Sequence, residues 1–148
     1  MSGAAETGYS FRPLRFTLSL IGLTVVVASA NGALHAAAGF GLPQSAAGIL
    51  AIVGAVGIEG TLCGRRDGGA PGEALLRRIA VLMALWGAAT FTMLGLFGVV
   101  VAGGRLTGLP PGLWMSLLST VAIYGATLLI VGYLLFGAAA RRVAAERS

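Results

Sequence analysis

The sequence is poor in the residues that most catalytic and metal sites use. Its 148 residues include one histidine, one cysteine, five acidic residues and no lysine. A single cysteine cannot form a disulfide within the chain, and one histidine with one cysteine cannot complete an ordinary transition-metal site. Motifs for phosphate binding (G-x-x-x-x-G-K-S/T), redox chemistry (C-x-x-C) and serine hydrolases (G-x-S-x-G) are also absent. We therefore expect neither a self-contained enzyme nor a bound cofactor or metal.

Charge of either sign is scarce as well. Charged residues make up 10% of the chain and hydrophobic residues 57%, with a mean hydropathy of +0.91. Soluble domains carry about 25% charged residues, so this composition excludes a separate soluble domain and predicts an integral membrane protein. The net charge of +5 does not indicate nucleic-acid binding, because the arginines flank apolar runs rather than forming one basic face. The expected partner is the lipid bilayer.

Four apolar runs are long enough to cross a bilayer, which takes about 20 helical residues. We predict spans at about 16–38, 45–63, 75–102 and 113–137, in one transmembrane domain over residues 16–137, with tails at 1–15 and 138–148. A backbone in lipid must satisfy its own hydrogen bonds, so these runs must be helices. The predicted fold is therefore all-α, an up-down four-helix transmembrane bundle.

The arginines indicate how the bundle is oriented. Nine of the ten basic residues precede the first run, separate the second from the third or follow the fourth, and Arg105 alone falls on the other side. Positively charged flanks stay in the cytoplasm, so both termini are predicted there, in a multi-pass protein of the cell inner membrane. The arginines expected to set orientation or to face lipid headgroups are Arg12, Arg15, Arg65, Arg66, Arg77, Arg78, Arg141 and Arg142.

The first run leaves an alternative open. Two arginines, the apolar stretch that follows them and the triplet Ala28-Ser29-Ala30 also fit a secretory signal that is cleaved after Ala30. Cleavage would leave three spans. We expect the run to be retained, because its apolar character continues through Ala38 and such triplets arise easily in alanine-rich helices.

Glu59 is the carboxylate expected inside a span. Such groups are costly in lipid, usually face protein or water, and often mark a path for ions or protons. Glu59 stands six residues before Arg65, about 9 Å along a helix, and is therefore close to the layer of arginines. We expect a structural ion pair with Arg66, or with Arg77 or Arg78 across the hairpin. A proton or cation role and contact with a lipid headgroup are the alternatives.

Polar and small residues form stripes on the first and fourth spans. The first stripe comprises Thr17, Thr24, Ala28, Asn31 and His35, and the second comprises Ser116, Thr120, Tyr124 and Thr127. Asn31 and His35 are four residues apart and so share a helix face. Helix packing is the expected role, because small and polar faces commonly mediate it in lipid. The alternative is a hydrated groove between these spans, in which His35 titrates near the outer surface.

Glycines at helical spacing predict close approach of helices. Gly57, Gly60 and Gly64 lie on one face of the second span, and Gly125 and Gly132 are seven residues apart in the fourth. Such residues permit close contact within the bundle or between protomers. They indicate packing without fixing the number of protomers.

The segment between the second and third spans carries a resemblance to a known group. Its landmarks are Gly60, Gly64-Arg65-Arg66, Pro71, Glu73 and the return to apolar sequence at Ile79-Ala80. In this order it resembles uncharacterised bacterial four-span inner-membrane proteins that have a basic loop with Pro and Glu at this place. The resemblance implies a four-span inner-membrane protein and no particular activity.

Packing features thus outnumber reactive ones. The leading hypothesis is a small non-enzymatic membrane protein that acts through helix–helix association, as a homo-oligomer or as an accessory subunit of a membrane-protein partner. The alternative is a small proton- or cation-coupled transporter or channel that uses Glu59, with Asn31 and His35 lining a path between helices.

Overall fold

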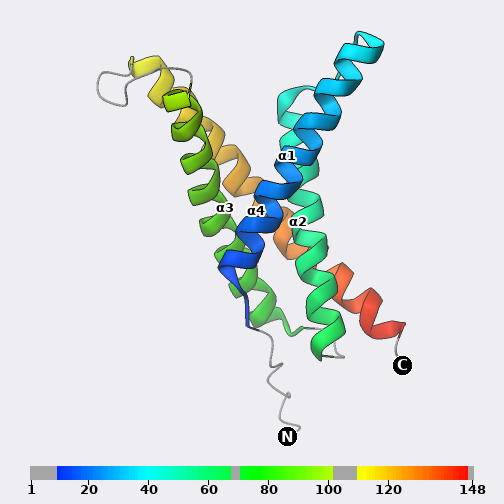
Figure 1. Ribbon diagram of the computed structural model, residues 1–148. Coiled ribbons are helices and arrows are strands. Elements are labelled where there is room, and N and C mark those ends of the chain that lie inside the picture. Colours follow the sequence, from blue (N-terminus) through cyan, green and yellow to red (C-terminus); the bar gives the residue numbers. More distant parts are fainter. Residues whose placement is uncertain (1–9, 68–70, 102–109, 147–148) are drawn as a thin grey trace, which may run out of the picture.

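The computed structural model describes residues 10–67, 71–101 and 110–146, and it is all-helical (Figure 1). The helices are α1 (Pro13–Ala38), α2 (Gln44–Asp67), α3 (Glu73–Val101) and α4 (Pro111–Ala145). Each of these four is long and apolar enough to cross a membrane, which confirms the predicted helical class and the four candidate spans. Ala102, Arg105 and Arg147 lie outside the described residues.

Local sequence explains several helix ends. Pro13 and Pro111 stand in the first turns of α1 and α4, where the missing N–H of proline is tolerated. At the end of α1, Gly39 adopts a left-handed φ of 71°, which a residue without a Cβ adopts easily. Its N–H donates to the carbonyl of His35 at 3.0 Å and so satisfies one of the last carbonyls of the helix.

Two helices extend beyond the C-terminal ends of their expected apolar spans. α2 runs to Asp67 rather than 63, and α4 runs to Ala145 rather than 137. Both extensions contain arginines in the last helical turns, where a positive side chain interacts favourably with the helix dipole. Arg65, Arg66, Arg141 and Arg142 therefore lie on helical backbone.

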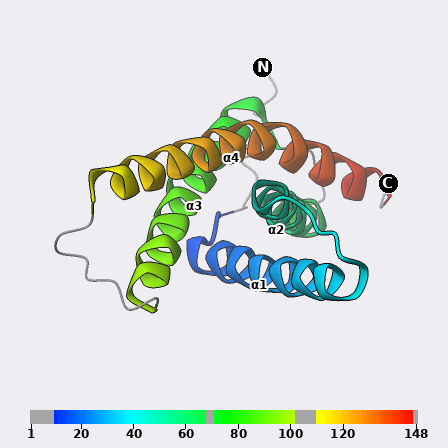
Figure 2. The same cartoon turned by 90° about the horizontal axis from the view of Figure 1, so that it is seen from above.

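Two antiparallel hairpins, α1–α2 and α3–α4, pack side by side. α2 packs against α4 and α1 packs against α3, so both helices of each hairpin take part in the contact. Seen from above, α2 lies between α1 and α4 (Figure 2). The hairpins meet at one end, where α1 and α3 begin and α2 and α4 end, and diverge toward the other end (Figure 1). We call these the converged end and the splayed end.

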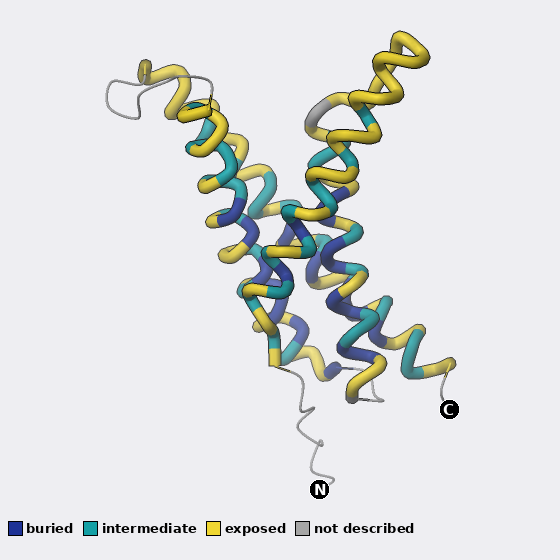
Figure 3. Tube along the Cα trace, in the orientation of Figure 1, coloured by how far each residue is buried: buried dark blue, intermediate teal, exposed yellow. Residues whose placement is uncertain are grey.

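The apolar core lies in the half of the molecule near the converged end. The buried residues of α1 are Phe16 and Leu20, both in its first turns. All four helices contribute to one cluster, made of Phe16, Leu20, Ile52, Ala55, Val56, Cys63, Leu76, Ile79, Met83, Leu128, Phe136 and Ala140. Toward the splayed end the helices are largely exposed (Figure 3). Helices that are apolar on their exposed faces suit a lipid environment.

Candidate functional site

A buried ion pair joins α1 to α2. Arg15 Nε donates to Glu59 Oε1 at 2.8 Å, and Arg15 Nη2 donates to Glu59 Oε2 at 2.6 Å. The Glu59 side chain has no exposed surface, whereas the Arg15 side chain is 33% exposed. The planar guanidinium thus meets both oxygens of the carboxylate, which is the strongest geometry for such a pair.

The chain brings these two residues to the same depth from the converged end. Arg15 lies in the first turn of α1, and Glu59 lies about two turns before the end of α2. Val56 and Cys63 flank Glu59 on its own helix face, and both are buried. The carboxylate therefore faces the core, and Arg15 covers it from the rim with its long side chain partly exposed.

Sequence spacing did not indicate this partner. The expected partners were Arg66, Arg77 and Arg78, but the ion pair forms with Arg15. α2 packs against α1 and α4, so the start of α1, rather than that of α3, lies beside Glu59. Arg77 instead donates to Glu73, one turn before it on α3. The true partners are 44 residues apart, and no local pattern encodes which helices become neighbours.

Asn31 closes the turn between α1 and α2. Its Nδ2 donates to the carbonyl of Leu42 at 2.9 Å, and the Leu42 N–H donates to Asn31 Oδ1 at 2.6 Å. His35 is exposed one turn further along α1. Asn31 lies about 24 Å along the helix from Arg15. The structure therefore does not bring Asn31 and His35 together with Glu59.

A groove opens between the two hairpins on the side of the splayed end, with a volume of about 580 Å³. We call it the outer groove. Parts of both polar stripes line it, Thr24 and Ala28 from α1 and Ser116, Thr120 and Tyr124 from α4, together with residues of α2 and α3. The ring of Tyr124 stacks on that of Phe91 at a centroid distance of 4.5 Å. Thr24 satisfies its own hydroxyl by donating to the carbonyl of Leu20 at 2.7 Å.

The glycine pair Gly60 and Gly64 of α2 mediates packing against α4 of the same chain. A Cβ added at Gly60 would lie 2.7 Å from the carbonyl oxygen of Phe136, and one added at Gly64 would lie 2.6 Å from that of Ala140. Without side chains, these positions let the backbones of α2 and α4 approach closely. Gly57, one turn away, has no such neighbour within 4 Å.

The glycines of α4 face α3. A Cβ added at Gly132 would lie 3.4 Å from Ala80 Cα, which is a close contact. At Gly125 the nearest atom would be Ala88 Cβ at 3.9 Å, an ordinary van der Waals separation. Gly132 therefore allows close packing of the second hairpin, and Gly125 makes a looser contact.

The described arginines lie on the helix ends that meet at the converged end. They lie just before α1 or in its first turn, at the end of α2, near the start of α3 and near the end of α4, and comprise Arg12, Arg15, Arg65, Arg66, Arg77, Arg78, Arg141 and Arg142. The opposite, splayed end carries His35 and the turn that Asn31 closes. Among the described residues, the arginines are thus concentrated at one end of the molecule.

Within the part of the chain that the structure describes, no group of three or more His, Cys, Asp or Glu side chains is placed to hold a metal ion. Cys63 is buried in the core cluster.

Comparison of the chain with protein-family models, with curated proteins and with solved structures found no match. The resemblance of the segment between α2 and α3 to bacterial four-span proteins therefore stays a prediction.

Proposed function

We propose that this protein is a small, non-enzymatic, multi-pass protein of the cell inner membrane that acts through association with transmembrane helices of other subunits. The observation that carries the proposal is the outer groove. There the two hairpins diverge and leave parts of the polar and small stripes of α1 and α4 facing open space. The helix that fills this groove belongs to a second copy of the chain or to a membrane-protein partner.

The chemistry of the groove supports this occupant. In lipid there is no hydrophobic force between helices, so small residues and hydroxyl groups at a helix face are what favour association. Ser116 and Thr120 of α4 are exposed and line the groove, and Ala28 of α1 lines it with a small side chain. A helix that packs here would bury all three, whereas lipid tails offer no partner to the hydroxyl groups.

The distribution of arginines supports the orientation. The eight described arginines lie on the helix ends that form the converged end, and positive residues are retained on the cytoplasmic side of the inner membrane. The converged end, where α1 begins and α4 ends, is then cytoplasmic, and the splayed end with the outer groove faces the other side.

The state of Glu59 does not favour the transporter alternative. A carboxylate that carries protons or cations must reach water and exchange its ligand. Glu59 has no exposed surface, and each of its oxygens accepts a hydrogen bond from Arg15. The ion pair instead links α1 to α2 near the core, as a structural element does.

The test is a pair of matched substitutions on α4. Ser116 lines the outer groove, whereas Ser119, three residues further on, is exposed outside it. The wild type, Ser116→Leu and Ser119→Leu are purified in mild detergent from their native membrane and examined by native mass spectrometry. We expect the wild type and Ser119→Leu to carry a stoichiometric partner, and Ser116→Leu to lose it because the leucine fills the groove.

The mass of the lost partner decides between the two forms of the proposal. A mass equal to that of the chain identifies a homo-oligomer, and a different mass identifies an accessory-subunit role. A wild type that is monomeric and without any protein partner, or an equal loss of partner in both variants, would refute association through the outer groove.

A further inference from the structure

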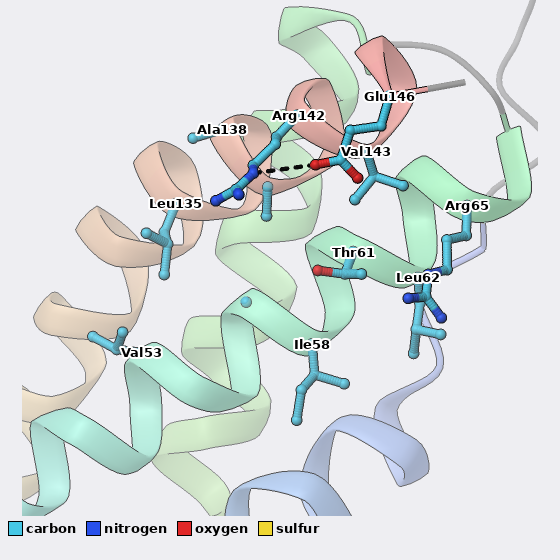
Figure 4. A pocket seen from close by; sticks show the side chains of 12 residues that line it. Val53, Ile58, Thr61, Leu62, Arg65, Leu135, Ala138, Arg142, Val143 and Glu146 are labelled. Carbon is cyan, nitrogen blue, oxygen red and sulfur yellow. Dashed lines mark hydrogen bonds and ion pairs between the residues drawn. The ribbon is translucent and has the colours of Figure 1, made fainter. Parts of the chain in front are cut away.

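A second groove lies at the converged end, between α2 and α4 (Figure 4). Its volume is about 800 Å³, within the ~300–1,000 Å³ that ligand sites usually have. We call it the inner groove. Apolar and small side chains line most of it, among them Val53, Ile58 and Leu135, and an arginine stands on each wall, Arg65 on α2 and Arg142 on α4.

The groove exists because of the glycine spacing of α2. Gly60 and Gly64 hold α2 and α4 in close contact, while Gly57 has open space where a side chain would stand. Gly57 lines the inner groove together with Ala138 and Ala139 of α4. Small residues on both helices thus leave the inner groove open beside a close helix contact.

The dimensions of the groove match one leaflet of a bilayer. Arg65 stands 12 residues after Val53 on the α2 wall, which is about 18 Å along the helix. Half of a hydrocarbon core is about 15 Å thick. Because Val53 and Ile58 are partly exposed along this length, the groove is open to the surrounding membrane. With the four helices across a bilayer, its apolar part would lie at the depth of the acyl chains and its arginines at the depth of the headgroups.

The charged end of the groove is positive. Arg65 and Arg142 line it, and Arg66 and Arg141 are their neighbours in the sequence. Glu146 also lines it and accepts a hydrogen bond from Arg142 Nε at 3.3 Å. The side chains of Arg142 and Glu146 are both highly exposed, and exposed ion pairs of this kind are weak. The Arg142 guanidinium can therefore exchange Glu146 for a phosphate, which it binds through two parallel N–H groups.

We propose that the inner groove binds an anionic phospholipid, with the headgroup phosphate between Arg65 and Arg142 and an acyl chain along Val53, Ile58 and Leu135. Basic pockets between transmembrane helices on the cytoplasmic side are suited to such headgroups. A soluble phosphate would gain nothing from the apolar length of the groove, and a zwitterionic lipid would bring a choline group against two arginines.

The test compares two double variants with the same change in charge. Arg65→Gln/Arg142→Gln removes the arginines that line the groove, and Arg66→Gln/Arg141→Gln removes their sequence neighbours. The full chain is delipidated and titrated in native mass spectrometry with phosphatidylglycerol, phosphatidylcholine and inorganic phosphate. We expect wild type to bind one phosphatidylglycerol at least tenfold more tightly than phosphatidylcholine, and inorganic phosphate to show no comparable binding.

The groove variant should lose at least tenfold in affinity for phosphatidylglycerol, and the neighbour variant less than threefold. An equal loss in both would mean that diffuse charge attracts the lipid, which overturns the site. Unchanged binding in the groove variant, or equal binding of the two lipids by wild type, overturns it as well. Thermal unfolding of both variants in detergent verifies that the compared chains are folded.

A further variant tests the apolar length with every charge intact. Gly57→Leu places a side chain into the inner groove, where the structure has open space, so the helix contact at Gly60 and Gly64 is preserved. Gly22→Leu, at a position of α1 that also has open space, is its control. We expect Gly57→Leu to lose the tight phosphatidylglycerol and Gly22→Leu to retain it. Retention in both variants, or loss of a bound protein rather than a lipid in Gly57→Leu, contradicts the proposal.

Discussion

The guanidinium of Arg15 donates two hydrogen bonds, of 2.8 and 2.6 Å, to the carboxylate of Glu59. The pair links the first turn of α1 to the buried face of α2. The two partners are unequal, because Glu59 is fully buried and the side chain of Arg15 is 33% exposed. Loss of one partner therefore has a different consequence from loss of the other.

Arg15→Gln should be more destabilising than Glu59→Gln. The first change leaves a buried carboxylate without its charged partner, which costs about 3 kcal/mol or more. The second leaves an arginine whose long side chain can turn toward solvent, so we expect a loss of about 1 kcal/mol. The double variant should be more stable than the sum of the single losses implies, by about 1 kcal/mol. The free energies of unfolding of the wild type, the two single variants and the double variant, measured in detergent by heat or denaturant, complete a double-mutant cycle. Additive losses of stability would show that the two side chains are not coupled.

Glu59→Gln should leave ion permeability unchanged. If the carboxylate is structural, proteoliposomes with wild type and with the variant have the same leak of protons and monovalent cations. The measurement is the decay of a pH gradient or of a potassium gradient, with protein-free liposomes as the baseline. A flux that wild type supports and the variant lacks would restore the transporter alternative and assign Glu59 to its path.

The glycines of α2 should differ sharply in their tolerance of alanine. Gly60→Ala and Gly64→Ala put a methyl group within 2.7 Å of a backbone oxygen of α4, so the helices must separate. We expect each to lower the free energy of unfolding by about 1–3 kcal/mol. Gly57→Ala meets open space, and we expect it to stay within about 0.5 kcal/mol of wild type. Equal effects at all three positions would mean that helix propensity rather than packing dominates.

Asn31→Ala should loosen the turn at the splayed end. It removes both hydrogen bonds to the backbone of Leu42, and we expect a loss of about 1 kcal/mol. His35→Ala alters an exposed side chain on the same face and should have almost no effect. Hydrogen exchange of the 39–43 segment is the more local measurement. Faster exchange in Asn31→Ala than in His35→Ala is the expected result, and equal rates would remove the proposed role of the amide.

The two ends of the molecule should lie on opposite sides of the membrane. Cys63 has no exposed surface, so a Cys63→Ala background with one new cysteine reports only the new position. Phe40→Cys, in the turn at the splayed end, should react with a membrane-impermeant maleimide added from outside. Glu146→Cys, at the converged end, should react only after the membrane is opened. The reverse pattern would invert the proposed orientation.

The candidate sites show which features the sequence could reveal. Glu59 was recognisable as unusual because a carboxylate in an apolar run is costly, but its partner Arg15 was not. The glycines were recognisable as packing positions, yet only the structure separates Gly60, which touches α4, from Gly57, which lines the inner groove. Asn31 was assigned to a polar stripe, and its bonds to Leu42 depend on how the chain turns after Gly39.

The sequence by itself determined the helices and their class, because hydropathy, run length and proline or glycine breaks act along the chain within one helix. It also determined which ends of the apolar runs the arginines flank, and hence the predicted orientation. The tertiary structure decided that α2 packs against α1 and α4, that Glu59 therefore meets Arg15, and that the hairpins converge at one end and open at the other. These features depend on side-chain packing between segments that are distant in the sequence, and in a chain this uniformly apolar many helix faces look alike until they are packed.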